Sequence, residues 1–422
     1  MSLLIYQIII KYIFCQLIIE YKKEIKKELK SPNEILLDLV ETEYYTNIKI
    51  GTPYQELKVN IEFTKNIFYI SGDEKYKKYN PTISSSYKLF SPNEKIEEFD
   101  LYIKGILSNE TIYFNNKKYE DFLFVLSENS TKKSKMYPSS IGLGISTNIY
   151  LKYSIAINFI NILYIKKQIN SNSFFINQKN ENEGQIIIGK FPHEFYLEKY
   201  KFKKYESSYI EITSYYNFWN CQFDFINFDN KTFYNNHLVL FDFNLEGLIL
   251  GKTFFDYVKD NFFRNYINEK ICFDKNYSNY IFIYCEKNKN INFENFSDII
   301  FYNRDFNYTF YFNYTELFKE KGNYTFFLIF SHIEYFSMVA LGRIFFNKYQ
   351  LGFNYDRRII LFYKDNLEKI INHRFNYLII IIFILFIILC FCLYYYLKIY
   401  KKKKKVYATE LDDDIKLSEK II

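Results

Sequence analysis

The chain has 422 residues, of which 22% are aromatic, so it can form one large or two medium domains with a sizeable core. Its formal net charge is +7, and residues 398–422, with eight lysines against five acidic residues, supply +3 of it. The remaining charge is spread thinly, without a basic face or a nucleic-acid-binding motif, which excludes a nucleic acid as the partner.

The chain begins with an apolar segment. Residues 3–19 are interrupted only by Gln7, Lys11 and Gln16, which is typical of a signal peptide or a signal anchor, and we assign residues 1–20 to it. Residues 21–43 then alternate lysine and glutamate. We interpret them as a short charged pre-segment that could form a solvated helix.

Strand patterns fill most of the chain between its two apolar ends. Runs of four to eight Ile, Val, Phe, Tyr and Thr residues, often alternating with polar residues, are separated by Gly, Asn, Asp and Ser clusters. The best helical patterns are few and lie at residues 150–164 and 251–263. No βαβ rhythm and no short repeat is present, so the pattern predicts an all-β domain.

Cysteines and glycosylation sequons are consistent with an oxidising compartment. Cys272 and Cys285 flank a short segment and could form one local disulfide, which leaves Cys221 as a buried thiol rather than a nucleophile. Eight Asn-x-Ser/Thr sequons are candidate glycosylation sites, although an Asn-rich chain also produces sequons by chance. They are at Asn109, Asn129, Asn230, Asn276, Asn295, Asn307, Asn313 and Asn323.

The C-terminal region contains a second apolar segment. Residues 378–397 carry no charge over twenty residues, which is enough for a helix to span about 30 Å of hydrocarbon. Lys398 and the lysines at 401–405 should lie on the cytosolic side. We expect a transmembrane helix rather than a buried core helix, a cytosolic tail at residues 398–422, and the main domain in the secretory lumen or outside the cell.

Seven segments, in order and at compatible spacings, resemble successive elements of the pepsin-like aspartic proteases over about residues 44–365. They read YYTNIKIGTPYQ, GILSNETIYF, SSIGLGIST, EGQIIIGKFPHEFY, NFWNCQFDFI, ENFSDIIFYNRDFNYTFYFN and VALGRIFFNKYQLGFNYDRRIILFY. The resemblance implies a bilobal all-β fold, with an N-terminal β lobe over residues 44–200 and a C-terminal β lobe over residues 201–365. It also implies aspartic endopeptidase ancestry.

The resemblance places the two catalytic acids at Glu62 and Asp242. In an aspartic protease two carboxylates share one proton and hold a water between them, so that one acts as base and the other as acid. Read without the resemblance, Glu62 is a carboxylate at a strand end and Asp242 is a turn residue. Glu62 also carries its carboxyl group one methylene further from the backbone than an aspartate does.

Neither catalytic motif retains the family sequence Asp-Thr-Gly. Phe63 and Phe243 stand at the threonine positions, whose hydroxyls cross-link the two loops in the family, and Thr64 and Asn244 stand at the glycine positions. We therefore expect the cross-link to be missing and the acids to be misplaced, and about 1 Å of misplacement can cost a hundredfold in rate.

Three positions are candidate ligand contacts by their place in the resemblance: Phe63, Phe243, and Glu98, which falls at the tyrosine of the family's flap. Arg343 stands where the family usually has an aspartate. The four histidines share no metal-site spacing, so we expect no metal and no other cofactor.

Three functions remain open. The first is a membrane-tethered pseudoprotease that binds a peptide or protein partner in the cleft between its lobes without cutting it. The second is an active membrane-anchored aspartic endopeptidase that uses Glu62 and Asp242. The third is a structural surface glycoprotein whose cleft is filled by side chains such as Phe63 and Phe243.

Overall fold

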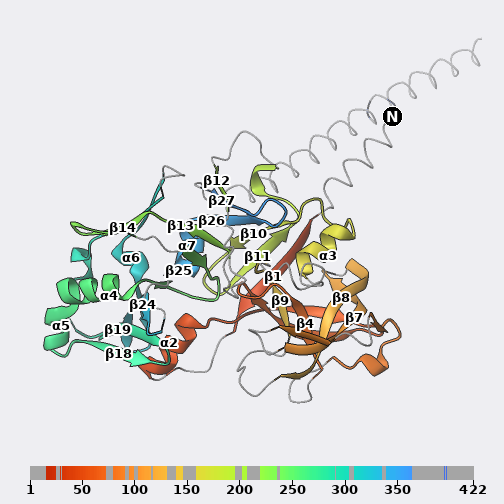
Figure 1. Ribbon diagram of the computed structural model, residues 1–422, viewed down its shortest axis with the longest axis horizontal. Coiled ribbons are helices and arrows are strands. Elements are labelled where there is room, and N and C mark those ends of the chain that lie inside the picture. The colour runs from red at the N-terminus through yellow and green to blue at the C-terminus, as the bar shows by residue number, and fades with distance from the viewer. Residues whose placement is uncertain are drawn as a thin grey trace, which may run out of the picture. The chain divides into compact units, whose positions relative to one another are not determined.

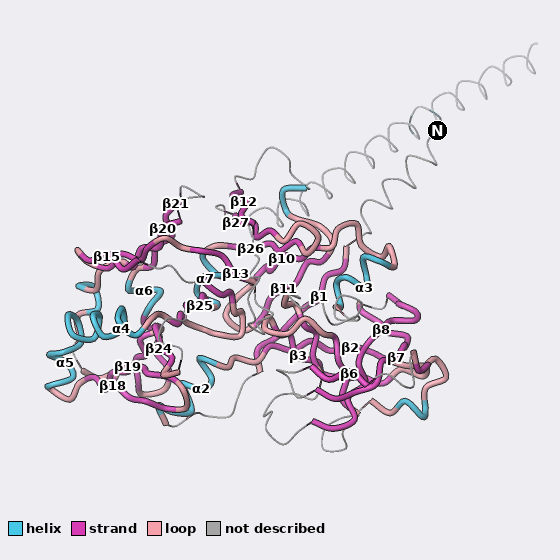
Figure 2. The backbone as a smooth tube through the Cα atoms, viewed as in Figure 1, coloured by secondary structure: helices cyan, strands magenta, loops and turns pink. Residues whose placement is uncertain are grey.

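A computed structural model describes most of the chain between residues 16 and 363. The described residues are 16–24, 29, 31–72, 79–90, 95–98, 103–115, 117–130, 139–145, 158–194, 202–206, 219–234, 238–289, 291–303, 308–334 and 339–363, with Tyr394 and Tyr396. Strands dominate them, as Figure 2 shows, and helices are short and few. The prediction of an all-β domain is therefore confirmed.

The largest sheet draws strands from both halves of the chain and has fourteen strands among the described residues. Its order is β12 (Phe202–Glu206), β27 (Ile359–Tyr363), β26 (Gln350–Asn354), β10 (Ser173–Gln178), β11 (Glu183–Ile188), β1 (Leu17–Lys23), β2 (Tyr44–Ile50), β3 (Gln55–Glu62), β9 (Ser140–Gly142), β4 (Phe68–Ser71), β8 (Lys117–Ser130), β7 (Ile103–Phe114) and β5 (Lys88–Leu89), while β6 (Lys95–Glu98) pairs with β7. C-terminal strands β26 and β27 thus share a sheet with β1, the first strand among the described residues.

Two smaller sheets are built from residues of the second half. A nine-stranded sheet contains β13 (Asn220–Gln222), β16 (Leu238–Phe241), β25 (Val339–Leu341), β17 (Leu248–Ile249), β24 (Ile329–His332), β19 (Tyr280–Glu286), β23 (Tyr324–Phe327) and β22 (Phe318–Lys321), with β18 (Cys272–Tyr277) beside β19. A four-stranded sheet contains β15 (Lys231–Tyr234), β14 (Phe225–Phe228), β20 (Ile299–Asn303) and β21 (Tyr308–Phe312).

The helices are short and lie between strands (Figure 1). They are α2 (Pro32–Val40), α3 (Phe159–Ile165), α4 (Lys252–Val258), α5 (Arg264–Asn268), α6 (Tyr314–Leu317) and α7 (Arg343–Lys348), with the 3-10 helices η1 (Pro81–Ile83), η2 (Pro192–Glu194) and η4 (Phe293–Asn295) and the π-helix η3 (Lys259–Phe263). The helix predicted at residues 251–263 is confirmed by α4 and η3. Of the helix predicted at residues 150–164, the described part begins at α3.

The segment before residue 44 differs from its prediction. β1 takes in residues 17–20, the end of the segment assigned to the leader, and pairs with β11 from Leu17↔Ile188 to Lys22↔Glu183. Helix α2 forms in the pre-segment, but it is packed rather than solvated, because Ile35, Leu36 and Leu39 are almost fully buried. In Figure 1 its red ribbon lies among elements of the second half, and the ion pair between Asp38 and Lys321 joins it to β22.

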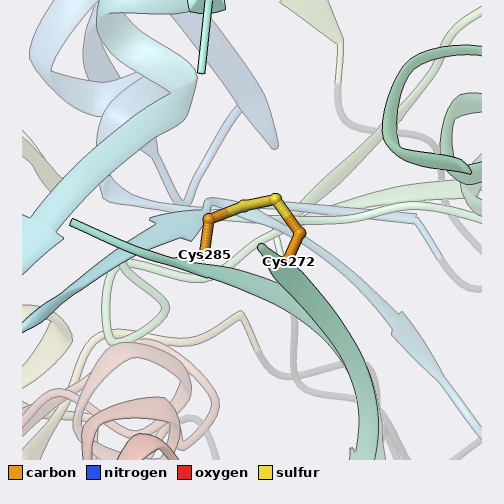
Figure 3. Close-up of a disulfide and its surroundings, with 2 residues drawn as sticks. All are labelled: Cys272 and Cys285. Atoms are coloured by element: carbon orange, nitrogen blue, oxygen red, sulfur yellow. A yellow bond between two sulfur atoms is a disulfide. The ribbon is translucent and has the colours of Figure 1, made fainter. Parts of the chain in front are cut away.

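A disulfide joins Cys272 of β18 to Cys285 of β19, as predicted (Figure 3). The two residues are directly paired across the β18–β19 ladder. Cys221 is a buried free thiol in β13. The cysteine interpretation therefore holds at all three positions.

The chain divides into two compact units, residues 1–365 and 366–422. The predicted transmembrane helix at residues 378–397 lies outside the described residues, except for Tyr394 and Tyr396, and so does the tail at 398–422. Among the residues that the structure describes, no helix combines the length and the apolar composition that crossing a membrane would require.

Candidate functional site

Glu62 and Asp242 occupy equivalent places in two similar strand arrangements. Glu62 ends β3, which runs parallel to β9, and β9 pairs antiparallel with β4. Asp242 follows β16, which runs parallel to β25, and β25 pairs antiparallel with β17. The backbone anchors both loops, through Leu143 N–H to Glu62 O at 2.7 Å and Asp242 N–H to Leu341 O at 3.1 Å.

The Asn244 side chain joins the two loops directly. Its Nδ2 donates to the carbonyl oxygens of Ile61 and Thr42, both at 3.0 Å, and its Oδ1 accepts from the Phe63 N–H at 3.3 Å. Its backbone N–H donates to Asp242 Oδ1 at 2.9 Å. One residue therefore binds the backbone on both sides of Glu62 and also orients Asp242.

This bridge corrects the expectation that the cross-link would be missing. The two threonines are gone, but the amide at a glycine position supplies one donor and one acceptor in their place. Sequence reasoning treated Asn244 only as a lost glycine. A possible signal was its residue type, because an asparagine two residues after an acid in a turn readily bonds to nearby backbone.

Glu62 is held in a buried ion pair that sequence reasoning missed. Lys65 Nζ lies 2.6 Å from Glu62 Oε2 and donates to the Tyr69 hydroxyl at 3.1 Å. The two charged residues are only 3% and 6% exposed. Burial lowers the pKa of Lys65, but the Glu62 carboxylate and Tyr69 outweigh it, so that the pKa is raised and the ammonium stays charged. The i, i+3 spacing was visible in the sequence, but the burial was not.

One oxygen of Glu62 remains without a partner. Glu62 Oε1 is buried and has no hydrogen bond to any residue that the structure describes. A buried acceptor left unsatisfied costs on the order of 1–3 kcal/mol, so this oxygen favours any donor that can reach it. The Lys65 pair therefore satisfies only part of the carboxylate.

Asp242 sits in a different electrostatic environment from Glu62. Its side chain is half-buried, and burial raises its pKa to about 6. The nearby Glu62 charge contributes to this rise, while backbone hydrogen bonds from Asn244 and Leu245 oppose it. Asp242 is thus ionised at neutral pH and protonated in mild acid.

Tyr280 of β19 belongs to the same neighbourhood. Burial raises the pKa of Tyr280, and the charges of Asp242 and Glu41 raise it further. The Tyr280 ring meets His332 edge to face at 5.3 Å between centroids. Neither Tyr280 nor Glu41 was identified from the sequence.

Phe63 and Phe243 pack in the core next to the two loops and do not form a ligand-binding surface. Both side chains are fully buried, their ring centroids are 5.7 Å apart, and both pack against Phe346, at 5.5 and 5.4 Å. Their assignment as ligand contacts is wrong, because neither side chain is accessible to a ligand. That they fill the cleft stays a prediction.

Glu98 ends β6, opposite Ile103 in the β6–β7 hairpin. Residues 99–102, the tip of this hairpin, lie outside the described residues, as does the side-chain environment of Glu98. A hairpin is therefore present where the resemblance places the flap. The role of Glu98 as a ligand contact stays a prediction.

Arg343 is the centre of a second buried charge cluster. It is fully buried, pairs with Glu246 at 2.5 Å, and donates to the Tyr44 hydroxyl and to the Glu181 carbonyl. Burial lowers the pKa of Arg343 to about 10, so the guanidinium is still charged at neutral pH. Lys319 also binds Glu246, at 2.7 Å. The cluster connects β2, β22 and α7, so its role is structural.

The pre-segment is attached to the same region. Asp38 of α2 is buried and pairs with Lys321 of β22 and with Lys23 of β1, the latter at 3.6 Å. The Glu246 N–H donates to the Leu39 carbonyl at 2.7 Å. β1 and α2 are therefore integral parts of the fold.

Two cavities lined by described residues lie elsewhere. One of about 350 Å³ is lined by residues of α3, η2 and the β26–β27 hairpin, including His193 and Arg357. The other, of about 300 Å³, is lined by residues of α6, α7 and β22, including Lys319 and Lys348. Over the part of the chain that the structure describes, no group of His, Cys, Asp and Glu side chains is arranged to hold a metal ion.

The sequons differ in their accessibility. Four are exposed in turns or short elements of the second half: Asn230, Asn276, Asn295 and Asn323. Asn109 and Asn313 are half-buried, and Asn313 uses its side chain to cap α6. The Asn129 side chain and all of Asn307 lie outside the described residues.

Comparison with known protein families gives one match. The family model of the eukaryotic aspartyl proteases matches residues 43–364, which include both loops and all three sheets from β2 to β27. No curated protein matches the sequence.

Proposed function

Because the chain belongs to the eukaryotic aspartyl protease family, we propose that it is a catalytically impaired member that binds a peptide or protein segment at its interlobe site. The observation that carries this proposal is the Lys65–Glu62 ion pair at 2.6 Å. Family chemistry needs two carboxylates that share one proton around a water. The Lys65 ammonium instead occupies an oxygen of Glu62, which is an arrangement that the family's proton-sharing pair does not have.

The second candidate is an active endopeptidase, and one specific observation favours it. The Asn244 side chain joins the two loops that carry the acids, despite the lost threonines and glycines. Asp242, with a pKa raised by burial to about 6, is also suited to proton transfer in mild acid. The third candidate is a structural protein with a filled cleft, and the burial of Phe63 and Phe243 against each other is compatible with it.

The membrane topology remains part of the proposal. A single-pass protein with its main domain in the secretory lumen or outside the cell accounts for the apolar segment at residues 378–397 and the lysines after it. The Cys272–Cys285 disulfide supports an oxidising compartment. The four exposed sequons support a glycoprotein.

The test of catalysis uses the full-length chain in a mild non-ionic detergent. A mixture of unmodified peptides is incubated with it from pH 3 to pH 8, with and without a statine-type inhibitor, and mass spectrometry identifies any new termini. We expect no cleavage that the inhibitor blocks. Inhibitable cleavage that is abolished by Asp242→Ala, but not by Asp260→Ala on the exposed face of η3, would show an active protease.

A further inference from the structure

The larger of the two cavities lies where the β26–β27 hairpin meets α3 and η2. Its volume of about 350 Å³ is at the lower end of the range for small-molecule sites, which is about 300–1,000 Å³. None of its lining residues belongs to the loops that carry Glu62 and Asp242. A ligand of this cavity is therefore distinct from one that binds between the lobes.

The apolar part of the cavity is a strand face and a pair of stacked rings. Ile359 and Leu361 are two residues apart on β27, so their side chains share one face of the strand, and each is 3% exposed. The rings of Phe191 and His193 stack, with 5.6 Å between their centroids and 13° between their planes. His193 Nδ1 lies 2.9 Å from the Tyr363 hydroxyl, and this contact orients the imidazole. A ligand thus meets aliphatic groups and flat rings on this side.

The polar part of the cavity has hydrogen-bonding groups that the fold leaves unpaired. Arg357 is exposed, and its guanidinium makes no ion pair or hydrogen bond with another described residue. Asn354 is only 7% exposed, and its Oδ1 accepts the Arg357 N–H at 2.9 Å, while its Nδ2 has no partner among the described residues. Asp356 accepts one hydrogen bond, from Asn172 Nδ2 at 2.9 Å, which orients the carboxylate. Unpaired donors at a buried residue favour a ligand that brings acceptors.

The charges of the lining residues nearly cancel. Arg357 carries one positive charge, and Glu194 and Asp356 carry one negative charge each. Burial lowers the pKa of His193, so its imidazole is neutral at neutral pH. The guanidinium disfavours a cationic ligand and the two carboxylates disfavour an anionic one. The lining therefore favours a neutral ligand with an apolar face and several hydroxyl groups.

We propose that this cavity binds a neutral sugar ring, either as a free sugar or as part of a glycan. The C–H groups of the ring pack on Phe191, His193 and the β27 face, and Tyr164, which is 38% exposed at the end of α3, adds a further aromatic ring. The hydroxyls donate to the Asp356 carboxylate and accept from Arg357 and Asn354. Planar guanidinium, amide and carboxylate groups suit this role because each can bind two neighbouring hydroxyls at once.

The test is saturation-transfer difference NMR on the full-length chain. A polyoxyethylene detergent replaces glycoside detergents, which carry sugars themselves, and an N-glycanase, removed before the titrations, strips any glycans of the chain that would compete. Methyl glycosides of glucose, galactose, mannose and N-acetylglucosamine represent free sugars, and an oligomannose glycopeptide with its sugar-free peptide represents protein-borne glycans. Cyclohexanol, acetate and methylammonium represent apolar, anionic and cationic ligands.

We expect at least one sugar to bind with a Kd of about 1 mM or tighter, and the three simpler probes to bind at least about tenfold more weakly. Saturation should be strongest at the C–H protons of one ring face, because that face packs on the aromatic rings. Preference for the glycopeptide over its sugar-free peptide and over the methyl glycosides assigns the site to glycans, and the reverse assigns it to free sugars. Peptide cleavage plays no part in this readout, so the result is independent of the function proposed above.

Two variants localise the binding, each with a control of the same residue type. Arg357→Ala and Tyr164→Ala should each weaken sugar binding by at least about fivefold. Arg264→Ala on α5 and Tyr234→Ala on β15 remove exposed side chains elsewhere and should change the Kd less than about twofold.

Three results would each overturn the proposal. They are the absence of sugar binding up to about 20 mM, equal binding of cyclohexanol or of a charged probe, and sugar binding that survives both Arg357→Ala and Tyr164→Ala. The emission of the buried Trp219 checks that each variant is folded. If one variant does not fold, the other decides.

Discussion

Asn244→Ala tests whether one side chain holds the two halves of the site together. The substitution removes three hydrogen bonds, from Asn244 to Ile61, Thr42 and Phe63. At about 1 kcal/mol for each bond, the free energy of unfolding should fall by about 3 kcal/mol. Unfolding entropy for a domain of about 350 residues converts this loss into a decrease of about 4 °C in Tm.

The assay is thermal unfolding of the full-length chain in detergent, followed by tryptophan fluorescence. Trp219 is the chain's single tryptophan, is fully buried, and donates to the Leu143 carbonyl at 2.9 Å, so its emission reports loss of the core. Asn261→Ala is the control, because its side chain makes one exposed bond to the Tyr257 carbonyl. It should shift Tm by less than about 1 °C.

A comparison with glycine sharpens the test. Asn244→Gly restores the residue type of the family motif, yet it should lower Tm slightly more than Asn244→Ala, because glycine adds about 0.5–1 kcal/mol of backbone freedom to the unfolded chain. If either variant matches the Asn261→Ala control, the bridge does not hold the loops. A gain in Tm for the glycine variant would refute the reasoning outright.

Other variants probe the charges and the disulfide. Lys65→Met leaves the Glu62 carboxylate buried without its cation and should lower the free energy of unfolding by about 3–5 kcal/mol. The double variant Glu62→Gln/Lys65→Met should recover most of that stability. Urea unfolding of both variants measures the difference. Asp242→Asn should raise the free energy of unfolding at pH 7.5 by up to about 3 kcal/mol, because a folded-state pKa of about 6, above the ordinary aspartate value of 3.8, makes the ionised form destabilising. That advantage should shrink as pH falls from 6 towards 3.8, and a constant difference in Tm across this range would contradict it. Replacing Cys272 and Cys285 by alanine should lower the free energy of unfolding by about 3 kcal/mol, because the disulfide joins residues 13 positions apart. A reducing agent should then no longer change the Tm of this variant.

The strand pattern predicted an all-β domain, because strand content depends on local periodicity and turn residues. The Cys272–Cys285 pair was also visible as short spacing around one hairpin. The Asn244 bridge was not, since its partners Ile61 and Phe63 lie 183 and 181 residues away in the sequence. No local pattern encodes such a contact.

Burial was the other property that the sequence did not reveal. Lys65 beside Glu62 has the spacing of an ordinary surface pair, and only the fold makes it a buried one. Phe63 was read as a ligand contact because its neighbour is the catalytic position, but its side chain belongs to the core. The apolar run at Leu17 and Ile19 fits a leader and a sheet strand equally well, and periodicity alone does not separate the two.

The Arg343–Tyr44 contact joins residues 299 positions apart and lies wholly inside the protein. During synthesis, Tyr44 of β2 therefore cannot form its hydrogen bond with Arg343 until nearly the whole domain has been synthesised. β10 likewise cannot pair with β26 until that strand has been synthesised. Such long-range closure slows folding and prolongs exposure of unpaired strand edges. Nascent chains that stop short of residue 343 should consequently depend on chaperones, whatever the finished molecule binds.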